Sequence, residues 1–378
     1  MRVAGPGAPA PSACADCLRR AWLLVALSAH IERMATGSPG SRSAELLRLS
    51  DADLAAAVAP KDADRVLERI ARIPEAGMRR RIDDAGCWAS CHHDPRFPQA
   101  LREQADGPRS LICCGDPGLL GRLDAEEVVT IVGSRRASVY GREVARDLAA
   151  ELATAGLVVV SGMAHGIDGA AHHGALEAGA TVAVLGAAAD VAYPAAHRAL
   201  HRRICGHGLV ISEFAPGATP WRWCFPARNR IMAALGWMTV VVEAARRSGS
   251  LITAEMATEC GRDVGAVPGP VTSRGSAGAN ELLARGACVV RDAQDVLDAM
   301  LGPGAPRIER RGPALDPALA GVLGALERTP FPDAVASELG IPASEVTASL
   351  ARLEQLGYVS CSALGTYSRT ALVPPEAR

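Results

Sequence analysis

The sequence predicts an α/β protein built on a doubly wound, mainly parallel sheet, and two observations on residues 126–300 support this. Short runs of aliphatic and β-branched residues alternate with stretches of helical periodicity, such as 142–152 and 167–177. The short runs are almost continuously apolar, as in strands that helices cover on both faces. Because strand–helix–strand connections are right-handed, an extended Rossmann-like layered fold follows. The expected strands are 128–132, 157–160, 181–185, 209–211, 238–242, 264–267 and 287–290.

A helical region is expected ahead of this sheet. Residues 1–14 are rich in Ala, Gly and Pro and predict a disordered N-terminus. Between residues 18 and 82, apolar residues recur every three or four positions, which favours a small helical domain of the SAM-like type. We therefore expect this helical domain with its linker over 15–105 and the Rossmann-like domain over 106–300.

The C-terminal part predicts a winged helix. A Gly- and Pro-rich linker is expected at 301–312, followed by a compact tail at 313–378. Within the tail, Ser344 is expected to be the N-cap of the third helix. That helix carries only Arg352 as a basic residue, which is little for reading a major groove, so partner contact or dimer support is the expected use. The expected elements are helices at 317–326, 331–340 and 344–356 and a hairpin formed by 357–359 and 366–372.

Composition excludes several classes of protein. The net charge is −1, so binding to a polyanion must use a local basic patch. Lys61 is the only lysine, and it follows Pro60 instead of a Gly-rich loop, which excludes a P-loop ATPase or helicase. The apolar run 21–29 after two arginines resembles a signal peptide, but its amphipathic continuation favours a buried first helix. No stretch reaches the roughly 20 apolar residues of a membrane span.

The eleven cysteines are odd in number and lie mostly in apolar stretches, which is typical of reduced thiols and favours the cytoplasm. Two spacings resemble metal-ligand pairs: Cys14-x-x-Cys17, and Cys87-x-x-x-Cys91 followed by two histidines. The pairs are separated by seventy residues of sequence, and neither lies in a tight knuckle. No metal site and no cofactor are therefore expected.

Ligands of open α/β sheets bind beyond the carboxyl ends of the strands, and small residues follow nearly every strand here. Glycine and serine at these positions let a ligand approach the backbone and expose N–H groups at helix N-termini, a geometry that binds phosphate. The residues expected to bind at this edge are Ser134, Arg135 and Arg136 after the first strand, Ser161, Gly162, His165 and Gly166 after the second, and Ser250 after the fifth.

A segment rich in arginine and aromatic residues, 221–231, lies between the fourth and fifth strands. Its Arg228, Asn229 and Arg230 are expected to contact phosphates, while aromatic rings offer stacking surfaces for unpaired bases. For Trp221 and Trp223, packing in the core is an equally open alternative.

A catalytic site is not expected. His165, Asp168, His172 and His173 could form an acid–base set. However, His172 and His173 are adjacent on a helix and point apart, and no nucleophile stands at a recognisable spacing. Asp168 is better explained as a cap of its helix.

Taken together, the motifs at 126–298 resemble the DNA-processing protein A (DprA, or Smf) family. They include Gly133-Ser134-Arg135, Ser161-Gly162-x-Ala164-x-Gly166-Ile167-Asp168, Asp190-x-x-Tyr193-Pro194, Phe225-Pro226-x-Arg228-Asn229-Arg230, Ser248-Gly249-Ser250 and Val267-Pro268-Gly269. Two positions depart from the family pattern, namely His197 in place of an asparagine and Gly265 in place of an aromatic residue.

The resemblance implies a non-enzymatic protein that binds single-stranded DNA taken up during natural transformation, protects it and loads the RecA recombinase onto it. It also implies a homodimer whose two sheet edges form one DNA path. The family's binding residues correspond to Ser134 and Arg135, the Ser161-Gly162 turn with Gly166, and Asn229-Arg230.

Two other functions stay open at this point. A nucleotide phosphoribohydrolase of the LOG or lysine-decarboxylase-like group would share the sheet. Its Pro-Gly-Gly-x-Gly-Thr-x-x-Glu loop is missing here, where Pro268-Gly269-Pro270-Val271 stands instead. A transcription regulator would read duplex DNA with the winged helix and sense a nucleotide with the α/β domain.

Overall fold

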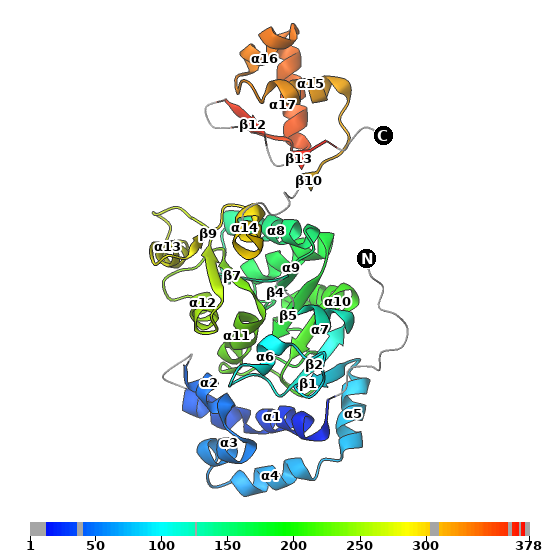
Figure 1. Ribbon diagram of the computed structural model, residues 1–378, viewed down its shortest axis with the longest axis vertical. Helices are drawn as coiled ribbons and strands as arrows, with labels where there is room; N and C mark the ends of the chain where they lie inside the picture. Colours follow the sequence, from blue (N-terminus) through cyan, green and yellow to red (C-terminus); the bar gives the residue numbers. More distant parts are fainter. Residues whose placement is uncertain are drawn as a thin grey trace. The chain divides into compact units, whose positions relative to one another are not determined.

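The computed structural model describes residues 13–35, 41–124, 127–302, 310–361, 365–369 and 372–374. The chain forms two compact units, Met1–Ala305 and Pro306–Arg378 (Figure 1). The first holds the sheet and every residue of the predicted binding edge, so the site is built within one unit.

A nine-stranded sheet forms the centre of the first unit, in the order β1-β2-β6-β5-β4-β3-β7-β8-β9. All seven predicted strands are present and pair in parallel, which confirms the predicted fold class. Two further strands, β1 and β2, extend the sheet antiparallel beyond β6. The strands are β1 (Trp88–Cys91), β2 (Ser110–Gly115), β3 (Val128–Val132), β4 (Val158–Ser161), β5 (Thr181–Leu185), β6 (Leu209–Ser212), β7 (Met238–Val241), β8 (Asp263–Ala266) and β9 (Cys288–Val289).

Helices cover both faces of this sheet (Figure 1). Every residue of β3, β4, β5, β6 and β7 is buried, which requires cover on both sides. Helix α8 packs along α9, and α11 packs along α12. The helices of this layer are α6 (Gln99–Arg102), α7 (Gly118–Arg122), α8 (Val139–Thr154), α9 (Ile167–Ala178), α10 (Arg198–His207), α11 (Cys224–Leu235), α12 (Gly249–Glu259), α13 (Ala277–Ala284) and α14 (Ala293–Leu301).

The strand order reverses direction at β3. From β3 the chain builds outward through β4, β5 and β6, and then returns through α11 to place β7 on the other side of β3. The turns after β3 and β7 therefore lead away from each other and leave a crevice at their carboxyl ends. The topology alone thus locates the best position for a ligand.

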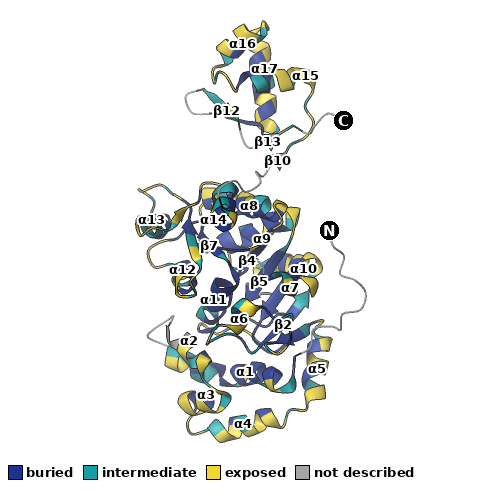
Figure 2. Ribbon diagram, viewed as in Figure 1, coloured by how far each residue is buried: buried dark blue, intermediate teal, exposed yellow. Residues whose placement is uncertain are grey.

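The N-terminal region is helical, as predicted, with α1 (Ala15–Ala35), α2 (Ser41–Arg48), α3 (Asp51–Val58), α4 (Ala63–Ala71) and α5 (Glu75–Asp84). The run resembling a signal peptide lies inside α1, which is largely buried (Figure 2). A linker was expected before residue 105. The structure instead places strand β1 there, paired with β2. Leu24 and Leu54 of the helices share one core with Ile112 and Leu185 of the sheet, so this region is not a separate domain.

The second unit contains three helices followed by an antiparallel hairpin, in the predicted order. Tyr358 is buried in its core, and its hydroxyl donates to the Pro313 carbonyl at 2.6 Å. The prediction of Ser344 as an N-cap is wrong, because the cap is Pro342 and no side chain caps this helix. The elements are α15 (Pro317–Ala325), α16 (Pro332–Leu339), α17 (Ala343–Gln355), the hairpin β11 (Val359–Cys361) and β12 (Tyr367–Arg369), and the pair β10 (Arg310–Arg311) and β13 (Leu372–Val373).

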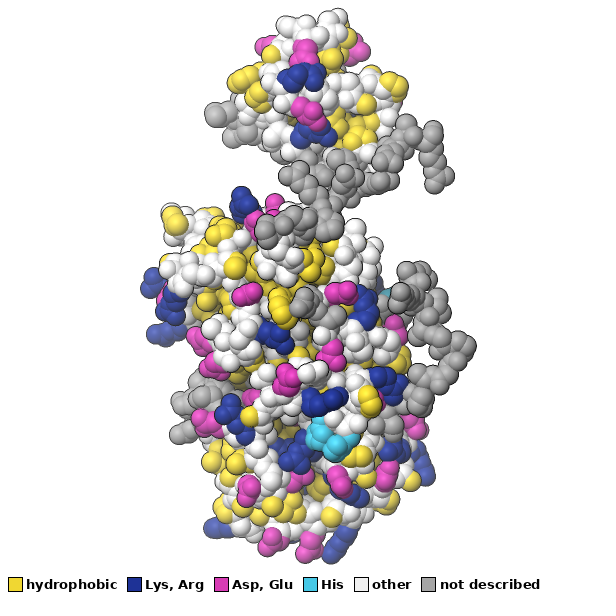
Figure 3. Space-filling model, viewed as in Figure 1, with side chains coloured by type: hydrophobic (Ala, Val, Ile, Leu, Met, Phe, Trp, Pro, Cys, Tyr) yellow, Lys and Arg dark blue, Asp and Glu magenta, His cyan; other side chains and the backbone are white. Residues whose placement is uncertain are grey.

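Charges are mixed over the face that Figure 3 presents, with basic and acidic side chains interspersed. This agrees with the net charge of −1 and directs attention to a local basic site. Within the described ranges, no helix has the length and apolar character needed to cross a membrane.

Candidate functional site

A pocket of about 680 Å³ opens at the crevice between the ends of β3 and β7. Most of its lining comes from the turn after β3, the start of α11, and the loop from β7 into α12. The end of α1 adds Glu32 and Ala35, and the segment after β4 adds Ala164 and Asp168. Six of the predicted binding residues are among its lining residues, namely Ser134, Arg135, Arg136, Arg228, Asn229 and Ser250. The predicted edge therefore coincides with the topological switch point.

Four exposed arginines give this pocket its positive character: Arg135, Arg136, Arg222 and Arg247. None of their guanidinium groups forms a hydrogen bond or an ion pair with another described residue. Helix α12 also begins at the pocket, where Ser248 caps it by accepting from the Ser250 amide at 3.4 Å. Free guanidinium groups beside a helix N-terminus are suited to phosphate.

An aromatic ledge adjoins these arginines. The Arg135 guanidinium carbon lies 4.9 Å from the ring centroid of Phe225, and the Phe225 ring lies 5.6 Å from that of Tyr193. Tyr193 is 42 % exposed, so a planar ligand can reach it. A second pocket of about 120 Å³ lies along this ledge and is lined by Gly162 and His165, which completes a surface offering both cations and rings.

The turn after β3 is held by Glu243, whose role the sequence did not reveal. The Glu243 carbonyl accepts from the Ser134 amide at 2.6 Å. Its carboxylate accepts from the Ser138 hydroxyl at 2.5 Å and from the Ser138 amide at 3.2 Å. Glu243 follows β7, so this network ties the two sides of the crevice together. Arg247 was also not included among the expected pocket residues. Its position directly before the Ser248-Gly249-Ser250 motif could have indicated it.

Two glycines of the predicted edge allow close approach of neighbouring groups. Gly166 has a φ of +78°, and a Cβ there would collide with the Ser134 carbonyl oxygen. At Gly162 a Cβ would collide with the guanidinium of Arg228. Ser161 is fully buried and its hydroxyl donates to the Ile131 carbonyl at 2.6 Å. In this structure Ser161 and Gly166 thus shape the strand ends beneath the pocket and do not line it.

Arg230 does not lie where the phosphate prediction placed it. It is 6 % exposed and forms a two-pronged ion pair with Glu213, at 2.9 and 2.8 Å. Its remaining donors bond to the carbonyls of Asp106 and Ala227 at 2.8 and 2.7 Å. Each of the three guanidinium nitrogens is hydrogen-bonded and the side chain is buried, so Arg230 braces α11 against β6. The prediction of a phosphate contact at Arg230 is corrected accordingly.

Arg228 is also buried, although it borders both pockets. Its guanidinium donates to the Gly162 carbonyl at 2.6 Å, to the Val184 carbonyl at 2.8 Å and to the Asn229 side chain at 2.9 Å. Burial lowers its pKa, and Asp168 at 3.7 Å opposes that effect. Arg228 therefore positions the strand ends and contributes charge from beneath the pocket.

The two tryptophans of the basic segment have different environments. Trp223 is 2 % exposed and packs edge-on against Phe214 at 5.5 Å, so core packing is correct for it. Trp221 is 42 % exposed and remains available to a ligand.

Two of the four residues considered for catalysis, Asp168 and His172, are buried in the fold. His172 is buried, its Nδ1 lies 2.7 Å from the Thr181 hydroxyl, and burial lowers its pKa to about 3. Asp168 is buried as well, and burial raises its pKa. The prediction that Asp168 caps its helix is wrong, because the N-cap of α9 is Gly166 and no side chain caps this helix. Asp168 lies in the first turn of α9 and accepts from the Ala164 amide at 3.4 Å.

At the two positions that depart from the family pattern, the structure shows how each residue fits. His197 Nδ1 lies 2.9 Å from the Met163 carbonyl, and its ring meets that of His165 edge-on at 4.8 Å. A Cβ at Gly265 would lie 2.5 Å from the Met238 side chain and 2.7 Å from that of Val290. The small residue at 265 therefore accommodates Met238 in the neighbouring strand.

The fold and this site define a Rossmann-like protein whose ligand crevice lies at the switch point of a mainly parallel sheet. The sequence model of DNA recombination-mediator protein A matches residues 88–301. The DNA processing protein DprA of Streptococcus pneumoniae (strain ATCC BAA-255 / R6) is 44% identical over 236 residues, which cover 60% of this chain and 82% of the relative.

Among the solved structures that resemble the chain, two are of DprA proteins. An X-ray structure of DprA from Streptococcus pneumoniae superposes with a TM-score of 0.60 at 35% identity, covering 75% of this chain and 95% of that one. A structure of DprA from Helicobacter pylori, described by its single-stranded DNA binding mode, has a TM-score of 0.50 at 32% identity over 54% of this chain and 93% of that one. The chain belongs to the DNA recombination-mediator protein A (DprA/Smf) family. Members of this family are DNA-binding recombination mediators and not enzymes, which excludes the phosphoribohydrolase alternative.

Proposed function

We propose that this protein binds single-stranded DNA at the crevice between β3 and β7, protects it, and loads RecA onto it during natural transformation. The observation that carries the proposal is the combination of four unpaired guanidinium groups with the Phe225–Tyr193 ledge. Phosphates need cations, and bases that are not paired can stack on rings, whereas a duplex hides its base faces. The Helicobacter pylori relative, described by its single-stranded DNA binding mode, supports the same ligand.

Arg135 has the central role in this proposal. It lies in the turn after β3, borders both pockets and stacks on Phe225. One guanidinium can therefore contact a phosphate while its flat face continues the ledge on which a base rests. Ser134 and Arg136 offer further donors in the same turn, and Ser250 lines the pocket at the start of α12.

The test is a fluorescence-anisotropy titration of poly(dT) and of a matched duplex at several salt concentrations. We expect preference for the single strand, with affinity that falls as salt rises. Arg135→Ala should lower the slope of log K against log salt by about 0.7, the share of one phosphate contact on a single strand. Arg69→Ala, which removes an exposed arginine from α4, is the matched control and should leave the slope unchanged.

Either of two results would contradict the proposal: equal binding of both DNA forms, or an unchanged salt slope in Arg135→Ala. Tight binding to one duplex sequence with a fixed footprint would instead favour the regulator alternative. For that alternative the C-terminal unit would have to act as a winged helix on duplex DNA, although α17 presents only Arg352 as a base-reading arginine.

The finer parts of the proposal concern partners. We infer a homodimer that joins two crevices into one DNA path and delivers the strand to RecA in the cytoplasm, with the winged-helix tail serving partner contact or dimer support. Sedimentation of the purified chain tests the dimer. RecA filament growth on strands coated with single-strand-binding protein tests loading, and no acceleration by the wild-type chain would contradict that part alone.

A further inference from the structure

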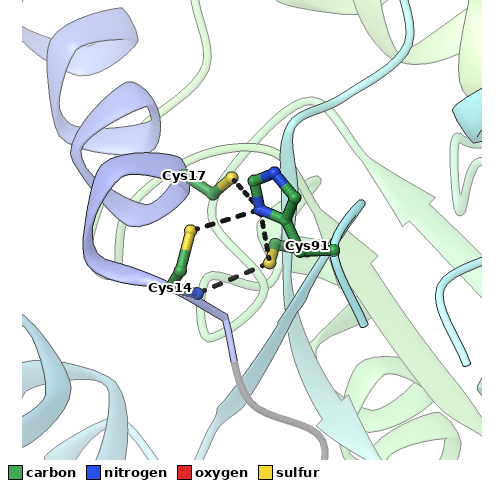
Figure 4. A group of neighbouring side chains, drawn as sticks. Cys14, Cys17 and Cys91 are labelled. Carbon is green, nitrogen blue, oxygen red and sulfur yellow. Dashed lines mark hydrogen bonds between the residues drawn. The ribbon is translucent and has the colours of Figure 1, made fainter. Parts of the chain in front are cut away.

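Four potential metal ligands meet at a place far from the crevice, where α1 begins beside the end of β1 (Figure 4). Cys14 directly precedes α1 and Cys17 lies in its first turn. Cys91 is the last residue of β1, and His93 lies in the turn that follows. The ligand atoms of all four lie within 4.8 Å of one another. The expectation of no metal site depended on their separation in sequence, and the fold removes that separation.

The distances fit a tetrahedral metal site. Nδ1 of His93 lies 3.4 Å from the sulfur of Cys14, 3.5 Å from that of Cys17 and 3.8 Å from that of Cys91. Zinc bonds of about 2.3 Å to sulfur and about 2.05 Å to nitrogen, at tetrahedral angles, separate the two atoms by about 3.6 Å. The observed distances centre on that value, so one ion would reach all four ligands with small adjustments.

Hydrogen bonding alone does not explain this convergence. A neutral imidazole nitrogen has one lone pair and accepts one S–H, whereas three thiols surround the same Nδ1. All three cysteines are free thiols in this structure. A cation at the centre would bind the three sulfurs as thiolates and the nitrogen through its lone pair, and would satisfy all four groups at once.

The surroundings also match those of a metal site. The Cys14 amide donates to the Cys91 sulfur at 3.4 Å. Nε2 of His92 lies 3.1 Å from Nε2 of His93, a contact that can place the His93 proton on Nε2 and leave Nδ1 free to bind. The backbone is anchored on both sides, since Ser110 donates to the Cys17 carbonyl at 3.0 Å and Arg79 donates to the Ala13 carbonyl at 2.8 Å.

We propose that Cys14, Cys17, Cys91 and His93 hold a structural Zn²⁺ ion that joins the N-terminal helices to the edge of the sheet. Three sulfurs and one imidazole nitrogen form a closed set of four protein ligands, the arrangement of structural and not catalytic zinc. Binding releases the thiol protons, so metal uptake is accompanied by acid release. The ion would link residues 17 and 91 across the whole helical region.

The experiment uses the full chain, purified under reducing conditions without chelator. Elemental analysis should find one zinc per chain. After removal of that zinc, titration with Co²⁺ should produce the strong visible bands of tetrahedral cobalt and the near-ultraviolet bands of cobalt–thiolate bonds, saturating at one equivalent. Cys17→Ser and His93→Ala should lose most of the bound zinc. Cys288→Ser, which changes an exposed cysteine in β9, should keep it.

His92→Ala tests the ligand set, because His92 lies beside His93 and its Nε2 is 3.9 Å from the Cys17 sulfur. This variant should keep its zinc. Wild-type protein without zinc and without tetrahedral cobalt bands would overturn the proposal, whether its thiols are all free or form a disulfide. Loss of zinc in His92→Ala but not in His93→Ala would overturn the ligand set. If the cysteine variants do not fold, the cobalt spectrum of the wild type still decides.

Discussion

Replacing Arg230 distinguishes a structural brace from a DNA contact. Both side chains of the Arg230–Glu213 pair are 6 % exposed, and two bonds of 2.9 and 2.8 Å join them. In Arg230→Ala, the Glu213 carboxylate is left buried without its partner. Breaking a buried pair in this way costs about 3–5 kcal/mol of unfolding free energy. With a urea slope of about 3 kcal/mol per molar, the unfolding midpoint should fall by about 1 M or more.

Urea unfolding followed by circular dichroism measures this loss, and the double variant Arg230→Met with Glu213→Leu is its control. Removing both charges leaves no unpaired buried ion, so the double variant should lose much less stability than Arg230→Ala. For DNA, the salt slope of Arg230→Ala, measured on its folded fraction, should match that of the wild type. An unchanged unfolding midpoint together with a slope reduced by about 0.7 would refute the reasoning and restore Arg230 as a phosphate contact.

Three further predictions test the ledge, the turn and the buried histidine. Phe225→Ala should weaken poly(dT) binding by about 1–3 kcal/mol through loss of stacking, while Phe331→Ala, an exposed ring in the second unit, should have no effect in the same anisotropy titration. Gly166→Ala should lower the free energy of unfolding by at least about 1 kcal/mol, since the φ of Gly166 is +78° and a carbonyl oxygen blocks the added Cβ. In the control Gly206→Ala, no atom lies within 4 Å of the added Cβ, so urea unfolding should show no measurable loss of stability. His172 binds its proton more readily unfolded than folded, because burial lowers the folded pKa to about 3. Its contribution to stability is therefore complete above about pH 6.5 and is lost as pH falls towards 3, by at most about 1.4 kcal/mol per pH unit. Urea midpoints measured over this pH range would contradict the prediction if His172→Gln showed the same pH dependence as the wild type.

The sequence determined the sheet and the edge at which the site lies. Strands such as 128–132 and 181–185 are continuous apolar runs between glycine-rich turns. Such runs can be recognised as strands without knowing which strands they pair with. The small residues after each strand also predicted the edge at which the pocket opens. Seven strands and the placement of Arg135 and Ser250 at one crevice followed from these local patterns.

Only the tertiary structure decided which of the polar residues face the crevice. Arg228 and Arg230 have the same chemistry as Arg135 but are buried, because α11 packs against the sheet. No pattern in the sequence of this segment predicts that Glu213 is the ion-pair partner of Arg230. The same holds for β1 and for the cluster of Cys14, Cys17, Cys91 and His93. Each depends on segments distant in sequence that the pairing of β1 with β2 and the docking of α1 bring together. Periodicity reports the environment of a residue along its own element, whereas contacts of this kind arise only when the elements pack.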